Sequence, residues 1–65
     1  MKLEEINRLK NKMSNEIIAF MRERRGHSKL VYEGVNQKQL AQIKRRDFIH
    51  FETLNRIYEI MRAIK

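Results

Sequence analysis

The chain has 65 residues, no cysteine and a formal net charge of +7, with a sequence pI of about 10.3. This length predicts a single domain over 1–65, whose small core gives marginal stability, and the lack of cysteine excludes disulfides and thiolate metal sites. The two histidines, His27 and His50, are too few for a zinc site, so neither a metal nor another cofactor is expected. A small domain without such staples often gains stability as a homodimer, which we expect here.

Membrane and catalytic functions are disfavoured by the pattern of residues. The opening MKLEEINRLK mixes both charge signs and lacks an apolar core, so it does not read as a signal peptide. The longest apolar run, 17–21, is far shorter than the roughly 20 residues of a membrane span, and a cytoplasmic protein without a membrane segment is expected. No Ser–His–acid set and no glycine-rich phosphate loop points to an enzyme. The strong positive charge favours a polyanionic partner, either nucleic acid or an anionic membrane surface.

The composition predicts an all-α domain, a small bundle of four or five helices. The chain has no proline and is rich in helix formers, so its two glycines, Gly26 and Gly34, mark turns. The first helix is predicted over about 3–25, with Gly26 as the C′ residue that ends it. Ser14 and Asn15 could cap a second helix start, but an unbroken apolar stripe favours one helix. The stripe consists of Leu3, Ile6, Leu9, Met13, Ile17 and Phe20.

Shorter elements are predicted after the first glycine. A helical segment over 27–33 has Ser28 as its expected N-cap and turns Leu30 and Val31 toward the core. A third helix is predicted over about 36–46.

The C-terminal part is predicted to be a loop and a last helix. In the loop over 47–50, Phe48 and Ile49 are both expected to be buried. The helix over about 51–64 has apolar residues recurring on one face. Its residues Tyr58, Met61 and Ile64 belong either to the core or to a two-fold dimer seam, and surplus apolar surface there favours the seam.

The chemically distinctive stretch is GVNQKQLAQIKRR, over 34–46. Its apolar underside consists of Val35, Leu40 and Ile43, and Asn36 is the expected N-cap. The remaining positions are mostly uncharged amides and cations. Amides can read base edges, adenine in particular, and cations bind phosphates. A solvated helix face would explain the same residues, but the preceding glycine turn and the cations at the end favour contact with nucleic acid.

This stretch resembles the helix-turn-helix of the Cro/CI-type (XRE-like) repressors of phages and bacteria, with the motif over about 28–46. The family's turn glycine corresponds to Gly34, and Gln37 stands where its recognition helices frequently have glutamine. Leu30 stands where the family usually has a small residue. Leu40 and Ile43 match the two buried positions of the family's recognition helix. Thr53 and Leu54 match the "TL" pair at the start of its next helix.

The resemblance implies a transcriptional regulator that binds an operator in double-stranded DNA as a homodimer, with the helix over 36–46 in the major groove. The expected base contacts are Gln37, Lys38 and Gln42, with Asn36 and Gln39 as secondary candidates. The expected phosphate contacts are Lys44, Arg45, Arg46, Lys29, Arg25 and Arg24.

Two alternatives belong to other classes. A small helical interaction module, such as a phage-type inhibitor or antirepressor of a host protein, would lay the helix over 3–20 into a groove of its partner. Binding of the same helix to an anionic membrane surface is disfavoured by its acids, Glu4, Glu5 and Glu16.

Overall fold

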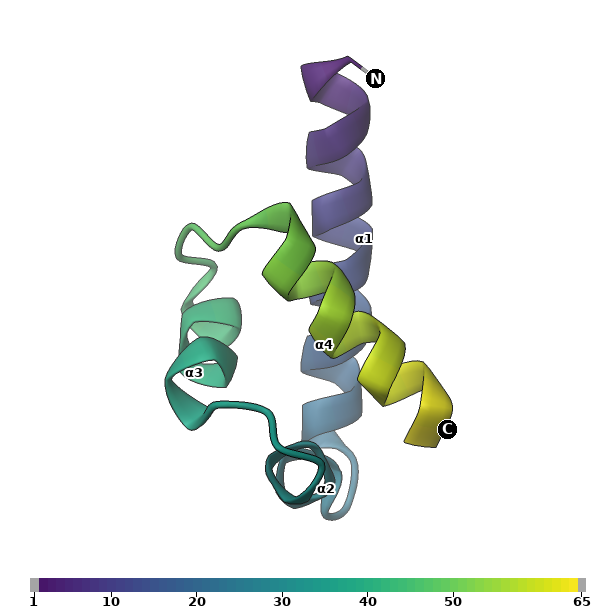
Figure 1. The fold of residues 1–65 in the computed structure, drawn as a ribbon, viewed down its shortest axis with the longest axis vertical. Coiled ribbons are helices and arrows are strands. Elements are labelled where there is room, and N and C mark those ends of the chain that lie inside the picture. The colour runs from purple at the N-terminus through teal and green to yellow at the C-terminus, as the bar shows by residue number, and fades with distance from the viewer. Residues whose placement is uncertain (1, 65) are drawn as a thin grey trace.

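A computed structural model describes residues 2–64 and contains four helices within them. They are α1 (Leu3–Arg22), α2 (Gly26–Tyr32), α3 (Gln37–Arg45) and α4 (Phe51–Ile64). Residues 2–64 contain no strand, so the predicted all-α bundle is confirmed, with four helices. Helix α1 packs against each of the other three, and most extensively against α4. Its first turns project beyond the rest of the bundle (Figure 1). No helix in the described span is long and apolar enough to cross a membrane.

The core is one cluster of apolar side chains drawn from all four helices and the loops between them. Its residues are Met13, Ile17, Phe20, Met21, Leu30, Val35, Leu40, Ile43, Ile49, Leu54, Ile57 and Met61. The stripe predicted on the first helix is therefore buried only from Met13 onward. Its earlier residues lie on the projecting part of α1, where Leu3 and Leu9 are exposed and Ile6 is half-buried.

The end of α1 differs from the prediction. The helix is continuous, as expected, but it ends at Arg22, and a β-turn follows that is closed by the Gly26 amide donating to the Glu23 carbonyl over 3.0 Å. Arg25 takes the left-handed conformation, with φ of 64°. Gly26 is therefore the first residue of α2 and not a C′ residue, and Ser28 is not its N-cap. Position 26 needs glycine for a close approach and not for a positive φ, because a Cβ there would lie 1.8 Å from the backbone oxygen of Phe20.

The loop between α3 and α4 buries one of its two apolar residues. Ile49 is in the core, as predicted, whereas the prediction for Phe48 is wrong because this side chain is 73% exposed. Its ring packs on the surface, with the Lys10 ammonium 4.5 Å from the ring centroid and the His50 ring edge-on at 5.2 Å. Of these two neighbouring residues only Ile49 lies in the core, and Phe48 instead contacts Lys10 and His50 at the surface.

The apolar face of α4 is used within the chain. Met61 is 1% exposed, and Tyr58 is half-buried with its hydroxyl donating to Glu16 Oε2 on α1 over 2.6 Å. Ile64 is half-buried against the same core. Of the two alternatives for these residues, the structure places Met61 in the core, with Tyr58 and Ile64 packed against it.

Candidate nucleic-acid interface

Helix α3 is an amphipathic helix whose orientation is set by two buried residues. Leu40 and Ile43 are almost fully buried in the core, and α3 packs against α1. Positions on the opposite side of a helix turn are then directed to solvent, and Lys38 and Arg45 are indeed exposed. The Asn36 side chain caps the helix as predicted, because its Oδ1 accepts a 2.7 Å hydrogen bond from the Lys38 amide.

The turn before α3 is a Schellman motif, which determines how the chain leaves α2. The Val35 amide donates to the Leu30 carbonyl over 3.1 Å, and the Gly34 amide donates to the Val31 carbonyl over 3.0 Å. Gly34 has φ of +97°, in the left-handed region that favours glycine. Val35 and Leu30 are both buried, which supplies the apolar contact that usually accompanies this motif. Leu30 therefore packs in the core, as predicted.

The five expected base contacts fall into two groups. Gln37 and Lys38 are exposed at the start of α3, and Gln42 is half-buried one turn further along. Asn36 is exposed but already uses its oxygen as the cap. Gln39 is half-buried, and its Oε1 is a buried oxygen without a hydrogen-bond partner among the described residues. Gln37 and Lys38 therefore lie exposed at the N-terminal end of α3, Gln42 lies one turn beyond Lys38, and Gln39 lies on the flank that turns toward the core.

The three cations at the end of α3 each contact another side chain. Lys44 Nζ lies 3.5 Å from Nδ1 of His27 on α2. Arg45 Nε donates to Asp47 Oδ2 over 3.0 Å, which is a salt bridge between two largely exposed groups. All three cations remain exposed, so they are available to an external anion.

The third of these cations links α3 to α1. Arg46 follows the helix in the left-handed conformation, with φ of 58°. Its Nη2 donates to Asn15 Oδ1 over 2.6 Å. Asn15 is neutral, so this contact fixes the position of the guanidinium without cancelling its charge.

The second expected phosphate cluster is associated with a different helix. Arg24 and Arg25 lie in the turn after α1, and Lys29 is exposed on α2. Arg25 and Lys29 line a shallow hollow together with Glu33 and with Ile64 of α4. These two cations therefore border α4, whereas Lys44 borders α2 through His27. The structure does not give the two clusters a shared contact.

One exposed aromatic residue was missed as a candidate contact. Tyr32 ends α2 and is 88% exposed, and it lines a hollow of about 310 Å³ with His27, Ser28, Val31 and Gln37. It therefore stands beside the first residue of α3. A phenol hydroxyl can donate to a phosphate oxygen, so Tyr32 joins the candidate contacts. Helical periodicity could have predicted this exposure, because Tyr32 lies two positions past the buried Leu30 and so on another face of the helix.

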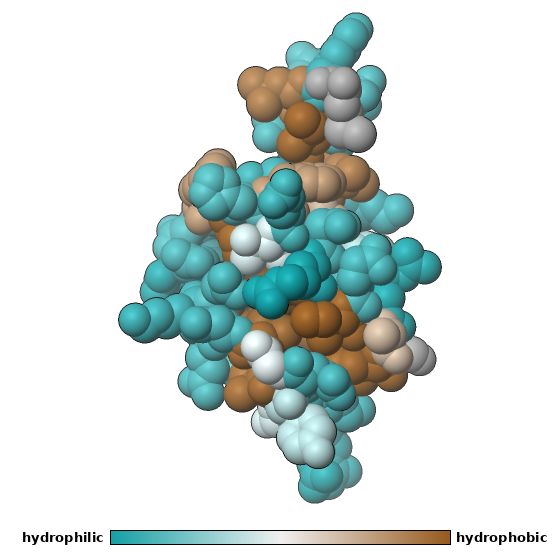
Figure 2. Space-filling model, in the orientation of Figure 1, coloured by the Kyte–Doolittle hydropathy of each residue, from teal (hydrophilic) through white to brown (hydrophobic). Residues whose placement is uncertain are grey.

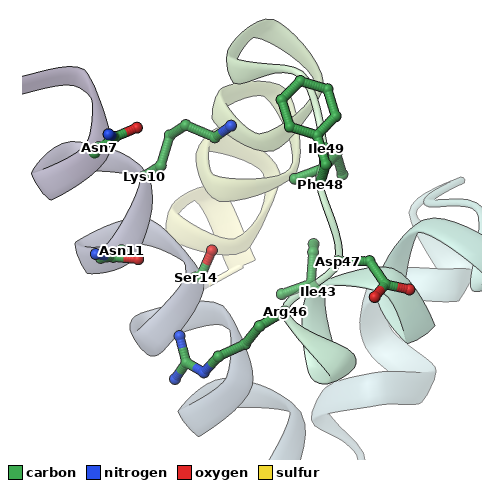
Figure 3. A pocket seen from close by; sticks show the side chains of 9 residues that line it. All are labelled: Asn7, Lys10, Asn11, Ser14, Ile43, Arg46, Asp47, Phe48 and Ile49. Atoms are coloured by element: carbon green, nitrogen blue, oxygen red, sulfur yellow. The ribbon is translucent and has the colours of Figure 1, made fainter. Parts of the chain in front are cut away.

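A separate hollow of about 310 Å³ lies between α1 and the loop after α3. Figure 3 shows Lys10 reaching from α1 toward Phe48, and Arg46 reaching back toward α1, with Asp47 turned away from α1. Ile43 and Ile49, both core residues, line its inner side. The hollow faces α1, so it is distinct from the outer side of α3.

The fold and surface define a small all-α domain with an exposed, amide-rich and cationic third helix. Comparison of the chain with known protein families, with curated proteins and with solved structures found no match. Among residues 2–64, no group of three or more histidine and carboxylate side chains is placed to hold a metal ion.

Proposed function

We propose that the protein is a sequence-specific DNA-binding transcriptional regulator, similar to Cro/CI-type repressors, that acts in the cytoplasm. In this proposal α2, the Schellman turn and α3 form a helix-turn-helix, and α3 enters the major groove. The observation that carries the proposal is the outer face of α3. Leu40 and Ile43 hold the helix against the core, and Gln37 and Lys38 are exposed, with Gln42 half-buried, after a well-defined turn.

The dimensions of α3 suit this role. Nine residues of α-helix are about 13.5 Å long, comparable to the roughly 12 Å width of the major groove. Glutamine can bind adenine through two hydrogen bonds, and lysine can donate to guanine. Gln37 and Lys38, at the start of the helix, would supply base contacts, and Gln42 would follow one turn later. Two copies on a symmetric operator would read half-sites about 34 Å apart.

The cations at the end of α3 would supply affinity that does not depend on sequence. Lys44, Arg45 and Arg46 are exposed and held by local contacts, which lowers the entropy cost of ordering them on a phosphate backbone. Tyr32 and the cluster of Arg24, Arg25 and Lys29 would contact phosphates flanking the groove.

The test is binding to random-sequence duplex DNA, measured by fluorescence anisotropy at about 50 and 200 mM salt. Several phosphate contacts predict a loss of affinity on the order of a hundredfold between these concentrations. Arg45→Ala should weaken binding and flatten the salt dependence. Arg8→Ala, which removes an exposed cation from the projecting part of α1, is the matched control and should change little. No binding at the low salt concentration would contradict the proposal.

Base readout needs a second experiment once an operator has been selected. Gln37→Ala should weaken binding to the operator and leave binding to random DNA almost unchanged. An equal loss on both would show that Gln37 does not read bases.

A second candidate function, a helical protein-interaction module, is favoured by the exposed apolar residues of α1. Leu3 is 72% exposed and Leu9 is 37% exposed on the projecting part of that helix. A partner held there would bind with weak salt dependence and would be sensitive to Ile6 and Leu9.

A further inference from the structure

The first half of α1 carries an apolar face that the rest of the described chain covers only in part. Leu3, Ile6 and Leu9 follow one another at three-residue spacing, so they share a side of the helix. Figure 2 shows apolar side chains on these projecting turns. The segment is the start of a continuous 20-residue helix whose second half is packed in the core. The packed half stabilises the helical conformation of the projecting half.

Charged residues of opposite sign flank this face. Glu5, Arg8, Leu9 and Lys12 line one shallow hollow along α1. Glu5 and Lys12 are seven residues apart, two helical turns along the same flank. The first turn of α1 therefore carries an acid on this flank, and the third turn carries a cation. Such an arrangement complements itself when two copies run in opposite directions.

We propose that two copies of this chain pair through the first half of α1, with the two helices antiparallel. In this pairing Ile6 of one copy packs against Leu9 of the other, and Glu5 of each faces Lys12 of the other. The two-fold symmetry repeats each contact. The overlap from 2 to 13 is about 18 Å long. The proposal concerns α1 alone and does not depend on DNA binding.

A parallel pairing is excluded by the bundle itself. From Met13 onward, the side of α1 that continues the apolar face is buried against the other helices. In a parallel pair the two bundles would compete for the same space. In an antiparallel pair they lie at opposite ends of the overlap.

The test is the molar mass of the full chain by sedimentation equilibrium, from about 10 to 500 μM and without DNA. A monomer–dimer equilibrium is expected. Glu5→Lys, and separately Lys12→Glu, should weaken dimerisation roughly tenfold, because each places like charges together at two symmetric positions. The double variant Glu5→Lys/Lys12→Glu should restore the wild-type dimer.

Glu4→Lys is the matched control. It makes the same charge change in the same helical turn but on the opposite side of α1, so dimerisation should stay close to wild type. Leu9→Gln should abolish the dimer while circular dichroism shows an unchanged helix content, because Leu9 lies outside the core. A chain that remains monomeric to 500 μM would overturn the proposal and leave this face to a different protein. A dimer that the double variant does not restore would overturn the antiparallel geometry.

Discussion

The Tyr58 hydroxyl donates a 2.6 Å hydrogen bond to Glu16 Oε2, joining α4 to α1 across 42 positions of sequence. It lies at the contact between α1 and α4, the most extensive helix–helix contact of the fold. The hydrogen bond to the Glu16 carboxylate, with partial desolvation, raises the pKa of Tyr58 above its ordinary value of 10.0. The folded chain therefore holds the phenol proton more tightly than the unfolded chain does.

Replacing this hydroxyl should make stability less sensitive to alkaline pH. A raised folded-state pKa contributes stability that is complete below pH 10 and is lost as the pH rises through the folded-state pKa. Tyr58→Phe should therefore have a lower Tm than wild type at pH 7, and the difference should shrink above about pH 10. Thermal denaturation followed by circular dichroism across pH 7–11 measures this. A difference that grows with pH would contradict the hydrogen bond.

The raised pKa can also be measured directly. Tyr32→Phe leaves Tyr58 as the single tyrosine of the chain. Its absorbance titration near 295 nm should have a midpoint above 10.0. Adding Glu16→Gln should lower that midpoint, since the carboxylate is the main cause of the shift. A midpoint at or below 10.0 in the first variant would refute the contact.

The two glycines should respond differently to alanine. Gly26→Ala places a Cβ 1.8 Å from the Phe20 oxygen, so we expect a loss of more than about 3 kcal/mol or failure to fold. At Gly34 a Cβ would meet nothing within 4 Å, and the cost arises only from its φ of +97°. We expect a loss of about 1–2 kcal/mol there. Urea denaturation of both variants measures the free energies of unfolding, and the reverse order would contradict the close approach of α2 to Phe20.

Substitutions of Asn36, the N-cap of α3, should distinguish its effect on stability from its effect on DNA binding. Asn36→Ala removes the oxygen that accepts from the Lys38 amide and should lower the free energy of unfolding by about 1 kcal/mol. Asn36→Asp keeps a capping oxygen and adds a favourable charge at the helix N-terminus, so stability should be retained or increased. The same charge should weaken DNA binding if α3 lies against phosphates. Equal stability of the two variants would show that the cap contributes nothing measurable.

The acid beside the cations of α3 should limit DNA affinity. Asp47→Asn removes the carboxylate that binds Arg45 and should strengthen binding to random DNA several-fold, with the salt slope rising by up to about 0.9. Stability should change by less than about 1 kcal/mol, because the salt bridge is between largely exposed groups. Glu59→Gln, which removes an exposed acid on α4, is the control. An identical effect of both variants would indicate net charge alone and not the position of Asp47.

Sequence patterns predicted the later helices well because their determinants are local. The last helix was expected over about 51–64 and spans Phe51–Ile64. Asn36 was expected to cap α3, and its side chain does so. The turn at Gly34 was also expected, because only a residue that tolerates positive φ suits it. Each of these depends on residues within a few positions of one another, which hydrophobic periodicity and capping rules describe directly.

The errors concern relations between elements. Phe48 and Ile49 are both apolar in sequence, but only Ile49 lies in the core. Met61 and Tyr58 were assigned either to the core or to a dimer seam, and the structure places Met61 in the core with Tyr58 packed against it. Periodicity identifies an apolar face of a helix, but it does not identify which segment covers that face.

The sequence by itself determined that this is a small, basic, all-helical domain with an amide-rich and cationic third helix, since composition, periodicity and capping act over one or two turns. Tertiary structure alone decided that Gly26 opens α2 close to the Phe20 carbonyl, and that the first turns of α1 project beyond the bundle, with Leu3 largely exposed. It also decided that Arg46 binds Asn15 and that the Gln39 oxygen is buried. These features depend on distances between segments remote in sequence, which are determined only when the helices pack on one core.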